Sequence, residues 1–441
     1  MKINVSKFNF VKMFEEFVRK KKIKRTIKLM RRGWAAGRKR GYAVGLNEGT
    51  RNGYAAGLNE GTKNGYAAGW NEGTKNGYAA GLDEGTKDGY SIGWKEGNKH
   101  GTPGLIVQDV PRPDYVVDFW DIRVLYIHPI HGGTYKVISQ GIIDGLRNLV
   151  REVYTATSVQ NVASLAAQIK PDLVLVLLGD AFPIEQVNAI GALGIKTAVW
   201  FTDDPYYNDV TAKIAPYYQY VFTQELSCLS AYPLLGGRQV HYLPLAVNTR
   251  LFHYQREDHS FSIDVCFMGT AWNDRISMFD QIAPYLSKKN ALIVGPDWNR
   301  MQNYHILSDK IRLEVLSPEE SARLINQSKI VINNHRSFND NTVFSNNSRN
   351  LPALSINPRT FEISACGAFQ LTDVRQELNR CYERGKEIET YSSPAELVEK
   401  IEYYLRHEDE RNAIALRGHS QTLKNHTYPR RLTTLLKVVF G

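Results

Sequence analysis

The stretch N-P-R-T-F-E-I-S-A-C-G-A-F-Q-L-T-D, Asn357–Asp373, predicts more about this protein than any other part of the chain. It places Arg359 and Glu362 just before or within the first turn of a helix, and an apolar strand, Ala368–Leu371, follows. A helix start carries about half a positive charge and unpaired N–H groups, so it attracts phosphates. A carboxylate one turn in can hold a sugar diol through two charge-assisted hydrogen bonds, each worth about 1.5–3 kcal/mol. This arrangement predicts a site for a nucleotide-sugar donor.

The same residues resemble a known family. F-E-I-S-A-C-G-A-F-Q-L-T-D is similar to the hallmark segment of the CgeB-like spore maturation proteins, a branch of the two-domain (GT-B) glycosyltransferases. Further segments agree in order and rough spacing, namely Trp200–Pro205, Val265–Arg275, Val294–Trp298, Ile330–Arg336 and Asn425–Arg431. The resemblance extends from about Asp121 to the C-terminus. It implies an α/β fold of two Rossmann-like, doubly wound domains that face a cleft, and a hexosyltransferase-like activity in spore surface maturation.

One position departs from the pattern of the wider retaining superfamily. Its members carry a second glutamate eight residues before the one matched by Glu362, and this chain has Leu354 there. The missing acid usually contacts the transferred sugar. The resemblance still implies retention of anomeric configuration. The alternative is a catalytically degenerate protein, serving as a structural or polysaccharide-binding spore-surface component that its glycine repeat assembles.

The positive charge of the chain is concentrated at its beginning. The 441 residues carry a formal charge of +10, but residues 1–40 hold 15 Lys and Arg against 2 acids, or +13, which leaves −3 for the rest. Phenylalanines at near-helical spacing predict that residues 1–40 form a basic amphipathic segment. It docks on its own protein or a partner, or it contacts an anionic surface. The near-neutral remainder makes nucleic acid the least favoured partner.

Residues 33–101 form an internal repeat in which every fourth residue is glycine, with a unit of 12 residues from Gly41 onward. Small residues at this spacing allow two helices to approach closely, so we expect self-association into a homo-oligomer. A flexible tether and a β-type repeat are the alternatives, because glycine weakens a lone helix by about 1 kcal/mol per residue. Residues 102–118 read as a linker.

Strands and helices alternate after the linker, which predicts parallel sheets with right-handed crossovers. We expect an acceptor domain over residues 119–255 and a donor domain over residues 256–428. In the first, strands are predicted at Asp121–Ile127, Val174–Leu178 and Thr197–Phe201. In the second, they are predicted at Ile263–Gly269, Asn290–Val294, Ile311–Val315, Lys329–Asn333 and Ala368–Leu371. The resemblance implies that residues 429–441 form a helix packing back across the junction.

Ligands of open α/β sheets bind beyond the carboxyl ends of the strands, which selects the loops of interest. His131, Gly132 and Gly133 follow the first strand and are expected at the acceptor, where glycines allow close backbone approach. Asp203 and Asp204 follow a later strand, and either one could orient an acceptor hydroxyl or act as general base. The other interpretation is a turn in which an aspartate caps the next helix.

In the second half, we expect donor contacts from three loops. Arg275 and Arg336 are candidates for neutralising a leaving diphosphate, since a preorganised guanidinium stabilises the charge of the transition state. The further donor-binding candidates are Gly269, Gly295, Asp297, Arg359, Phe361, Glu362 and Gly367. Glu362 is predicted to bind the ribose hydroxyls, with a UDP-sugar as the favoured donor and a glycan or glycoprotein as acceptor.

Neither a metal nor another cofactor is expected, because the arginines and the helix start can stand in for a cation. The four cysteines, Cys228, Cys266, Cys366 and Cys381, are widely spaced without a C-x-x-C pair, which argues against a metal site or a disulfide framework. No apolar stretch approaches the ~18 residues of a membrane helix. The N-terminus has no signal-peptide core. We therefore expect a cytoplasmic protein, in the mother cell or at the developing spore surface.

Overall fold

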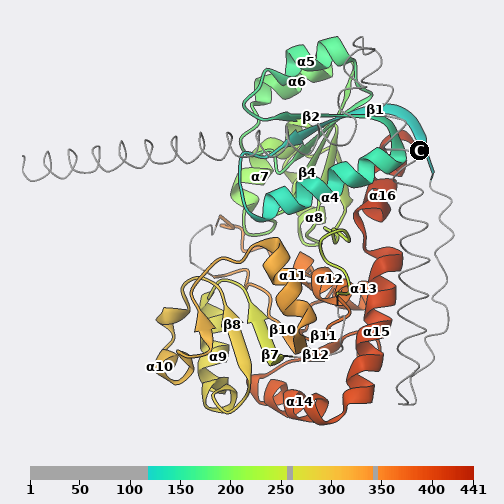
Figure 1. Ribbon diagram of the computed structural model, residues 1–441. Coiled ribbons are helices and arrows are strands. Elements are labelled where there is room, and N and C mark those ends of the chain that lie inside the picture. The colour runs from blue at the N-terminus through green and yellow to red at the C-terminus, as the bar shows by residue number, and fades with distance from the viewer. Residues whose placement is uncertain (1–117, 256–261, 341–345) are drawn as a thin grey trace, which may run out of the picture. The chain divides into compact units, whose positions relative to one another are not determined.

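The computed structural model describes residues 118–255, 262–340 and 346–441. The predictions for the basic segment 1–40, for the glycine repeat 33–101 and for the linker up to residue 117 lie outside the described residues. The described chain forms two parallel sheets of six strands each (Figure 1). The two predicted Rossmann-like halves are thereby confirmed.

The first sheet has the strand order β2-β1-β3-β4-β5-β6. Its strands are β1 (Trp120–His128), β2 (Val150–Thr157), β3 (Leu173–Leu177), β4 (Lys196–Phe201), β5 (Tyr220–Thr223) and β6 (Gln239–Tyr242). The connecting helices are α4 (Thr134–Leu149), α5 (Val162–Ile169), α6 (Ile184–Ala192), α7 (Asn208–Ile214) and α8 (Cys228–Leu234). β3 reads L-V-L-V-L and is buried throughout, as a central parallel strand covered on both faces should be.

The second sheet has the order β12-β11-β10-β7-β8-β9. Its strands are β7 (Ile263–Met268), β8 (Ala291–Val294), β9 (Ile311–Arg312), β10 (Ser328–Asn333), β11 (Phe369–Asp373) and β12 (Glu389–Tyr391). The helices are α9 (Asn273–Leu286), α10 (Tyr304–Leu307), α11 (Pro318–Asn326), α12 (Pro358–Ala365), α13 (Leu378–Cys381), α14 (Pro394–Arg406) and α15 (Glu408–Asn425). The predicted strand Ile311–Val315 is too long, because Val315 is already 82% exposed beyond the edge strand.

The last helix, α16 (Tyr428–Phe440), returns to the first half of the chain. Tyr428, Leu432 and Leu436 share a buried cluster with α4 and with the strands of the first sheet. Figure 1 shows α16 running beside α4. Among the described helices, none has both the length and the apolar composition that crossing a bilayer requires. All four cysteines are buried free thiols.

Two glycines of α4 let α16 approach closely, and this contact gives a stability prediction. A Cβ at Gly141 would lie 2.3 Å from Cδ2 of Tyr428, so Gly141→Ala forces the helices apart. We expect the free energy of unfolding to fall by about 1–3 kcal/mol. Gly191→Ala in α6 is the matched control, since its Cβ would meet no atom within 4 Å. It should be neutral or stabilising by up to about 1 kcal/mol. Denaturant unfolding measures both; equal effects would contradict the helix contact.

Candidate active site

Two pockets open at the carboxyl ends of the strands. The first, called here the α12 pocket, has a volume of about 370 Å³ and is lined by the start of α12 and by the loops after β1, β7, β8 and β10. The second, called here the tyrosine pocket, has a volume of about 270 Å³. Its walls are His131, Tyr135, Leu178, Asp180, Asp203, Tyr206, Tyr207, Trp272 and Arg336. Both lie where an open α/β sheet binds its ligands.

The start of α12 is held firmly. Pro358 occupies the first turn, and the Asn357 side chain caps the helix by accepting from the Thr360 backbone N–H at 3.0 Å. Asn333, at the end of β10, donates to Asn357 Oδ1 at 3.1 Å and to Thr360 Oγ1 at 2.9 Å. These bonds fix the helix start, with its N–H groups, against the sheet. A helix start held in this way has the geometry that can bind an anion.

Glu362 and Arg359 form an ion pair on the wall of the α12 pocket. Arg359 Nη1 lies 2.8 Å from Glu362 Oε2, and the glutamate side chain is 14% exposed. Burial raises the pKa of the Glu362 carboxyl, and the nearby Arg359 charge acts in the opposite direction. The carboxylate is therefore positioned by its neighbour while one face stays open to the pocket.

Arg275 is the buried cation of the α12 pocket. Its Nε and Nη2 donate to the Asn334 carbonyl at 2.9 and 2.6 Å, and its Nη1 donates to the Thr270 carbonyl at 2.9 Å. Burial lowers the pKa of Arg275 to about 10, which still leaves it charged at neutral pH. The guanidinium joins the loops after β7 and β10. Two of its five N–H groups remain for a ligand.

The floor of the α12 pocket depends on two glycines. A Cβ on Gly295 would lie 2.0 Å from the Gly269 carbonyl oxygen, and the φ of Gly295 is +153°. Trp298 Nε1 donates to the same carbonyl at 2.9 Å. These glycines allow the loops after β7 and β8 to lie in direct contact at the pocket.

The tyrosine pocket is built mainly from the first half of the chain. Tyr135 donates to Asp203 Oδ2 at 2.7 Å, and Thr202 donates to the same oxygen at 2.7 Å. Arg336 enters from the loop after β10, and its guanidinium lies 4.3 Å from the Trp272 ring and 4.7 Å from the Tyr206 ring. Cation–π stacking of this kind holds the charge at the pocket wall.

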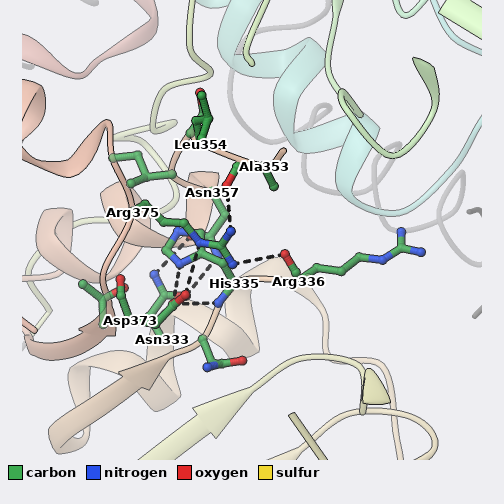
Figure 2. Close-up of polar contacts among 12 residues, drawn as sticks. Asn333, His335, Arg336, Ala353, Leu354, Asn357, Asp373 and Arg375 are labelled. Atoms are coloured by element: carbon green, nitrogen blue, oxygen red, sulfur yellow. Dashed lines mark hydrogen bonds and ion pairs between the residues drawn. The ribbon is translucent and has the colours of Figure 1, made fainter. Parts of the chain in front are cut away.

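A buried network supports the loop that carries Arg336. His335 Nδ1 lies 2.5 Å from Asp373 Oδ1, and Arg375 binds Asp373 Oδ2 at 3.1 Å and the Ala353 carbonyl at 2.8 Å. Figure 2 shows these contacts, with the Arg336 side chain extending away from them. His335 holds the pKa of Asp373 down to about 2 despite its burial. His335 thus acts as a buried hydrogen-bonding residue that supports the loop.

Three of the predicted site residues are structural. Asp204 is 2% exposed and accepts from Thr211, Thr223 and Tyr232, so it cannot meet an acceptor in the cleft. Phe361 is 1% exposed and stacks on the ring of His426, 4.8 Å between centroids, inside the core. Gly367 follows the end of α12 with φ +64° and packs on Tyr254. Phe361 and Glu362 are successive residues of α12 and lie about 100° apart around its axis, so Phe361 enters the core while Glu362 lines the α12 pocket.

Three further predictions change in detail. Arg336 lines the tyrosine pocket instead of the α12 pocket, so it does not share a site with Arg275. Asp297 is an exposed turn residue with φ +69°, while its neighbours Gly295 and Pro296 line the α12 pocket. Gly132 is exposed and lines neither pocket; Gly133 lines the α12 pocket, and His131 lines the tyrosine pocket.

The backbone at Leu354 is held by a carboxylate from the other half of the chain. Glu225 follows β5 and accepts from the backbone N–H groups of Leu354 and Ser355 at 3.0 and 3.2 Å. Burial raises the pKa of Glu225 to about 7. Glu225 was not predicted, since nothing in the sequence near residue 225 indicates a partner more than a hundred residues away.

Other contributors were also missed by the sequence analysis. Asn333, Asn334 and Asn357 all line the α12 pocket, and Asp180 and Trp272 line the tyrosine pocket. Their place in the sequence could have indicated them, because each residue follows a predicted strand or precedes a predicted helix.

Comparison with known proteins relates the chain to sugar transferases. A family model described as "Glycosyl transferase-like" matches residues 275–437. The spore protein CgeB of Bacillus subtilis (strain 168) is 26% identical over 314 residues, which cover 70% of this chain and 95% of that protein.

Solved structures with the same fold include three with a TM-score of 0.50. Sucrose-phosphate synthase from Thermosynechococcus elongatus is 9% identical and aligns over 72% of this chain and 99% of its own. HepE from Anabaena, in complex with UDP and glucose, is 12% identical over 72% of this chain and 98% of its own. A glycosyltransferase from Rickettsia africae ESF-5 matches at 12% identity with the same coverage. At these identities the likeness concerns the fold.

Proposed function

The chain is a CgeB-like protein with the GT-B glycosyltransferase fold, and from this we propose that it transfers a sugar from a nucleotide-sugar donor to a glycan or protein acceptor. One observation carries the proposal. A capped helix start, a buried arginine and a pocket-facing glutamate meet in the α12 pocket. The helix start suits the diphosphate of the donor, the arginine suits the negative charge that develops on it, and the glutamate suits the ribose.

The donor is assigned to the α12 pocket as follows. The N–H groups at the start of α12 bind the diphosphate, Arg275 neutralises the charge that develops on it, and Glu362 binds the ribose hydroxyls. Asn334 Oδ1, a buried oxygen without a hydrogen-bond partner among the described residues, is available to a sugar hydroxyl. UDP-sugars are the first donors to test, because the structure of HepE holds UDP and glucose. Arg275 supplies the positive charge at the leaving group, so the proposal needs no metal ion.

The acceptor is assigned to the tyrosine pocket, where Asp203 orients a hydroxyl and the rings of Tyr206 and Trp272 contact the sugar. By its similarity to CgeB the protein acts in spore surface maturation, in the mother-cell cytoplasm or at the developing spore surface. Assembly through residues 33–101 and contact with an anionic surface through residues 1–40 remain proposals. The resemblance implies retention of configuration; the residues around His131 favour inversion, as argued below.

The test is release of UDP from UDP-glucose, UDP-galactose and UDP-N-acetylglucosamine by the full chain, with water or an added glycan as acceptor. We expect cleavage of one donor above the others. The competing function is a degenerate transferase that binds polysaccharide as part of a surface structure, which Leu354 favours. That function predicts nucleotide or glycan binding without any UDP release, and this result would contradict transfer.

A further inference from the structure

We propose that His131, oriented by Asp180, is the general base that removes the proton from the acceptor hydroxyl, so that the sugar is transferred with inversion of configuration. This inference rests on the proposed function, since it assigns the chemistry of the same site. Its position after the first predicted strand indicated only that His131 lies in a loop expected at the acceptor.

The geometry of the pair is that of a base and its orienting carboxylate. His131 Nε2 lies 2.7 Å from Asp180 Oδ2, and the side chains are 40% and 10% exposed. A carboxylate accepts the Nε2 proton, which fixes the tautomer in which Nδ1 carries the free lone pair. The His131 ring also packs against the Tyr135 ring, 5.4 Å between centroids, which limits its rotation. The orienting carboxylate is thus nearly buried, while the His131 side chain is partly open to solvent.

The backbone that carries Asp180 is strained in order to place it there. Leu178 and Gly179, directly after β3, have φ values of +63° and +77°. A left-handed conformation costs a residue with a Cβ about 1–2 kcal/mol, so Leu178 is an outlier beside a pocket that it lines itself. The two left-handed residues turn the chain at the end of the buried strand and bring Asp180 to the wall. Strain of this kind is typical of functional positions.

The tyrosine pocket, which holds His131, and the α12 pocket, which is assigned to the donor, are lined by two of the same loops. The loop after β1 gives His131 to the tyrosine pocket and Gly133 to the α12 pocket. The loop after β7 likewise contributes Trp272 to the tyrosine pocket and Thr270 to the α12 pocket. A hydroxyl held against His131 is therefore next to the pocket assigned to the donor, as a direct displacement requires.

Asp203 is the competing candidate in the same pocket. Its Oδ2 already accepts hydrogen bonds from the hydroxyls of Tyr135 and Thr202. These bonds suit a group that positions a substrate hydroxyl. His131 has one hydrogen-bonded nitrogen and one available nitrogen, which suits a group that takes up a proton. The acid that usually contacts the transferred sugar in the retaining superfamily is absent at position 354, where leucine stands.

The step balances without further reactants. The acceptor oxygen forms a bond to the anomeric carbon as its proton moves to His131 Nδ1. The bond from that carbon to the diphosphate oxygen breaks, and its electron pair leaves with the nucleoside diphosphate beside Arg275. The imidazolium, stabilised by Asp180, then returns its proton to solvent. Attack opposite the leaving group converts an α-linked donor into a β-linked product.

The test uses the full chain, the three UDP-sugars named above and water as acceptor. Proton NMR of the freed sugar before mutarotation should show the β-anomer first. His131→Ala should lower kcat by about 10²- to 10⁴-fold with the affinity for UDP unchanged, and added imidazole should restore part of the rate. Asp180→Asn should also lower kcat while leaving the affinity for UDP unchanged. His305→Ala, an exposed histidine of α10, is the matched control.

The outcomes separate the two proposals. If the enzyme is active but releases the α-anomer first, or if the kcat of His131→Ala stays within threefold of wild type, His131 is not the general base. The proposed transferase function would still stand. A protein that binds UDP but cleaves none of the three donors overturns both. Unchanged UDP affinity in His131→Ala, measured by calorimetry, shows that the variant is folded.

Discussion

Replacing Arg275 by alanine is expected to lower the rate of donor cleavage by about 10²- to 10³-fold, the usual cost of removing a preorganised group from developing negative charge. Arg275 is 9% exposed, and its guanidinium stays charged at neutral pH, because burial lowers its pKa only to about 10. It also donates to the carbonyls of Asn334 and Thr270. The variant therefore loses both the charge and the bond between two loops. Steady-state kinetics with the cleaved UDP-sugar measures the effect.

Two further variants separate these roles. Arg275→Lys keeps the charge but cannot make three hydrogen bonds in the same geometry, so it should recover part of the rate. Arg323→Ala removes an arginine of α11 whose side chain is 51% exposed, and it should have no effect. If Arg275→Ala folds normally and keeps its kcat within threefold of wild type, the leaving diphosphate is not stabilised by Arg275.

Replacing Glu362 by alanine is expected to weaken UDP binding by about 10- to 100-fold, because two charge-assisted hydrogen bonds to the ribose are lost. Glu362 lines the α12 pocket, and Arg359 at 2.8 Å holds the carboxylate in place. Burial raises the pKa of this carboxyl. Since the bound diol favours the charged form, the affinity should fall as the pH is lowered through that pKa. Calorimetry with UDP at several pH values measures both effects.

A ligand control makes the Glu362 assignment specific. Wild type should bind 2′,3′-dideoxy-UDP more weakly than UDP, and Glu362→Ala should bind the two with similar affinity. Loss of affinity for both ligands in equal measure would place Glu362 away from the ribose. A change of less than threefold for UDP, in a variant with an unaltered circular dichroism spectrum, would also contradict the assignment.

Much of the fold could be predicted because the central strands are simple to recognise. β3 is a continuous apolar segment between polar residues, and the alternation of such strands with helices specifies a parallel sheet. The start of α12 was predictable from the segment around Pro358 and Glu362. The edge strand β9 was drawn too long because Leu313 and Val315 are apolar, yet 47% and 82% exposed. Hydrophobicity alone does not reveal where an edge strand loses its partner.

The parts of the site that could not be predicted depend on pairings between distant residues. Adjacent Asp203 and Asp204 look equivalent in sequence, but the first faces the tyrosine pocket and the second binds three hydroxyls in the core. His131 and Asp180 come together only because β1 and β3, the strands they follow, are neighbours in the sheet. Arg336 was predicted to bind the diphosphate because of its positive charge, but its guanidinium stacks on the Trp272 ring and lines the tyrosine pocket.

Calorimetric titration of the full chain with UDP, GDP, ADP and dTDP tests the central claim most directly, because a donor site must bind the nucleotide that leaves it. We predict micromolar binding of UDP in preference to the other three, and its loss in Glu362→Ala. Absence of binding to all four nucleotides would contradict the donor site, and with it the assignment of the protein as a working sugar transferase.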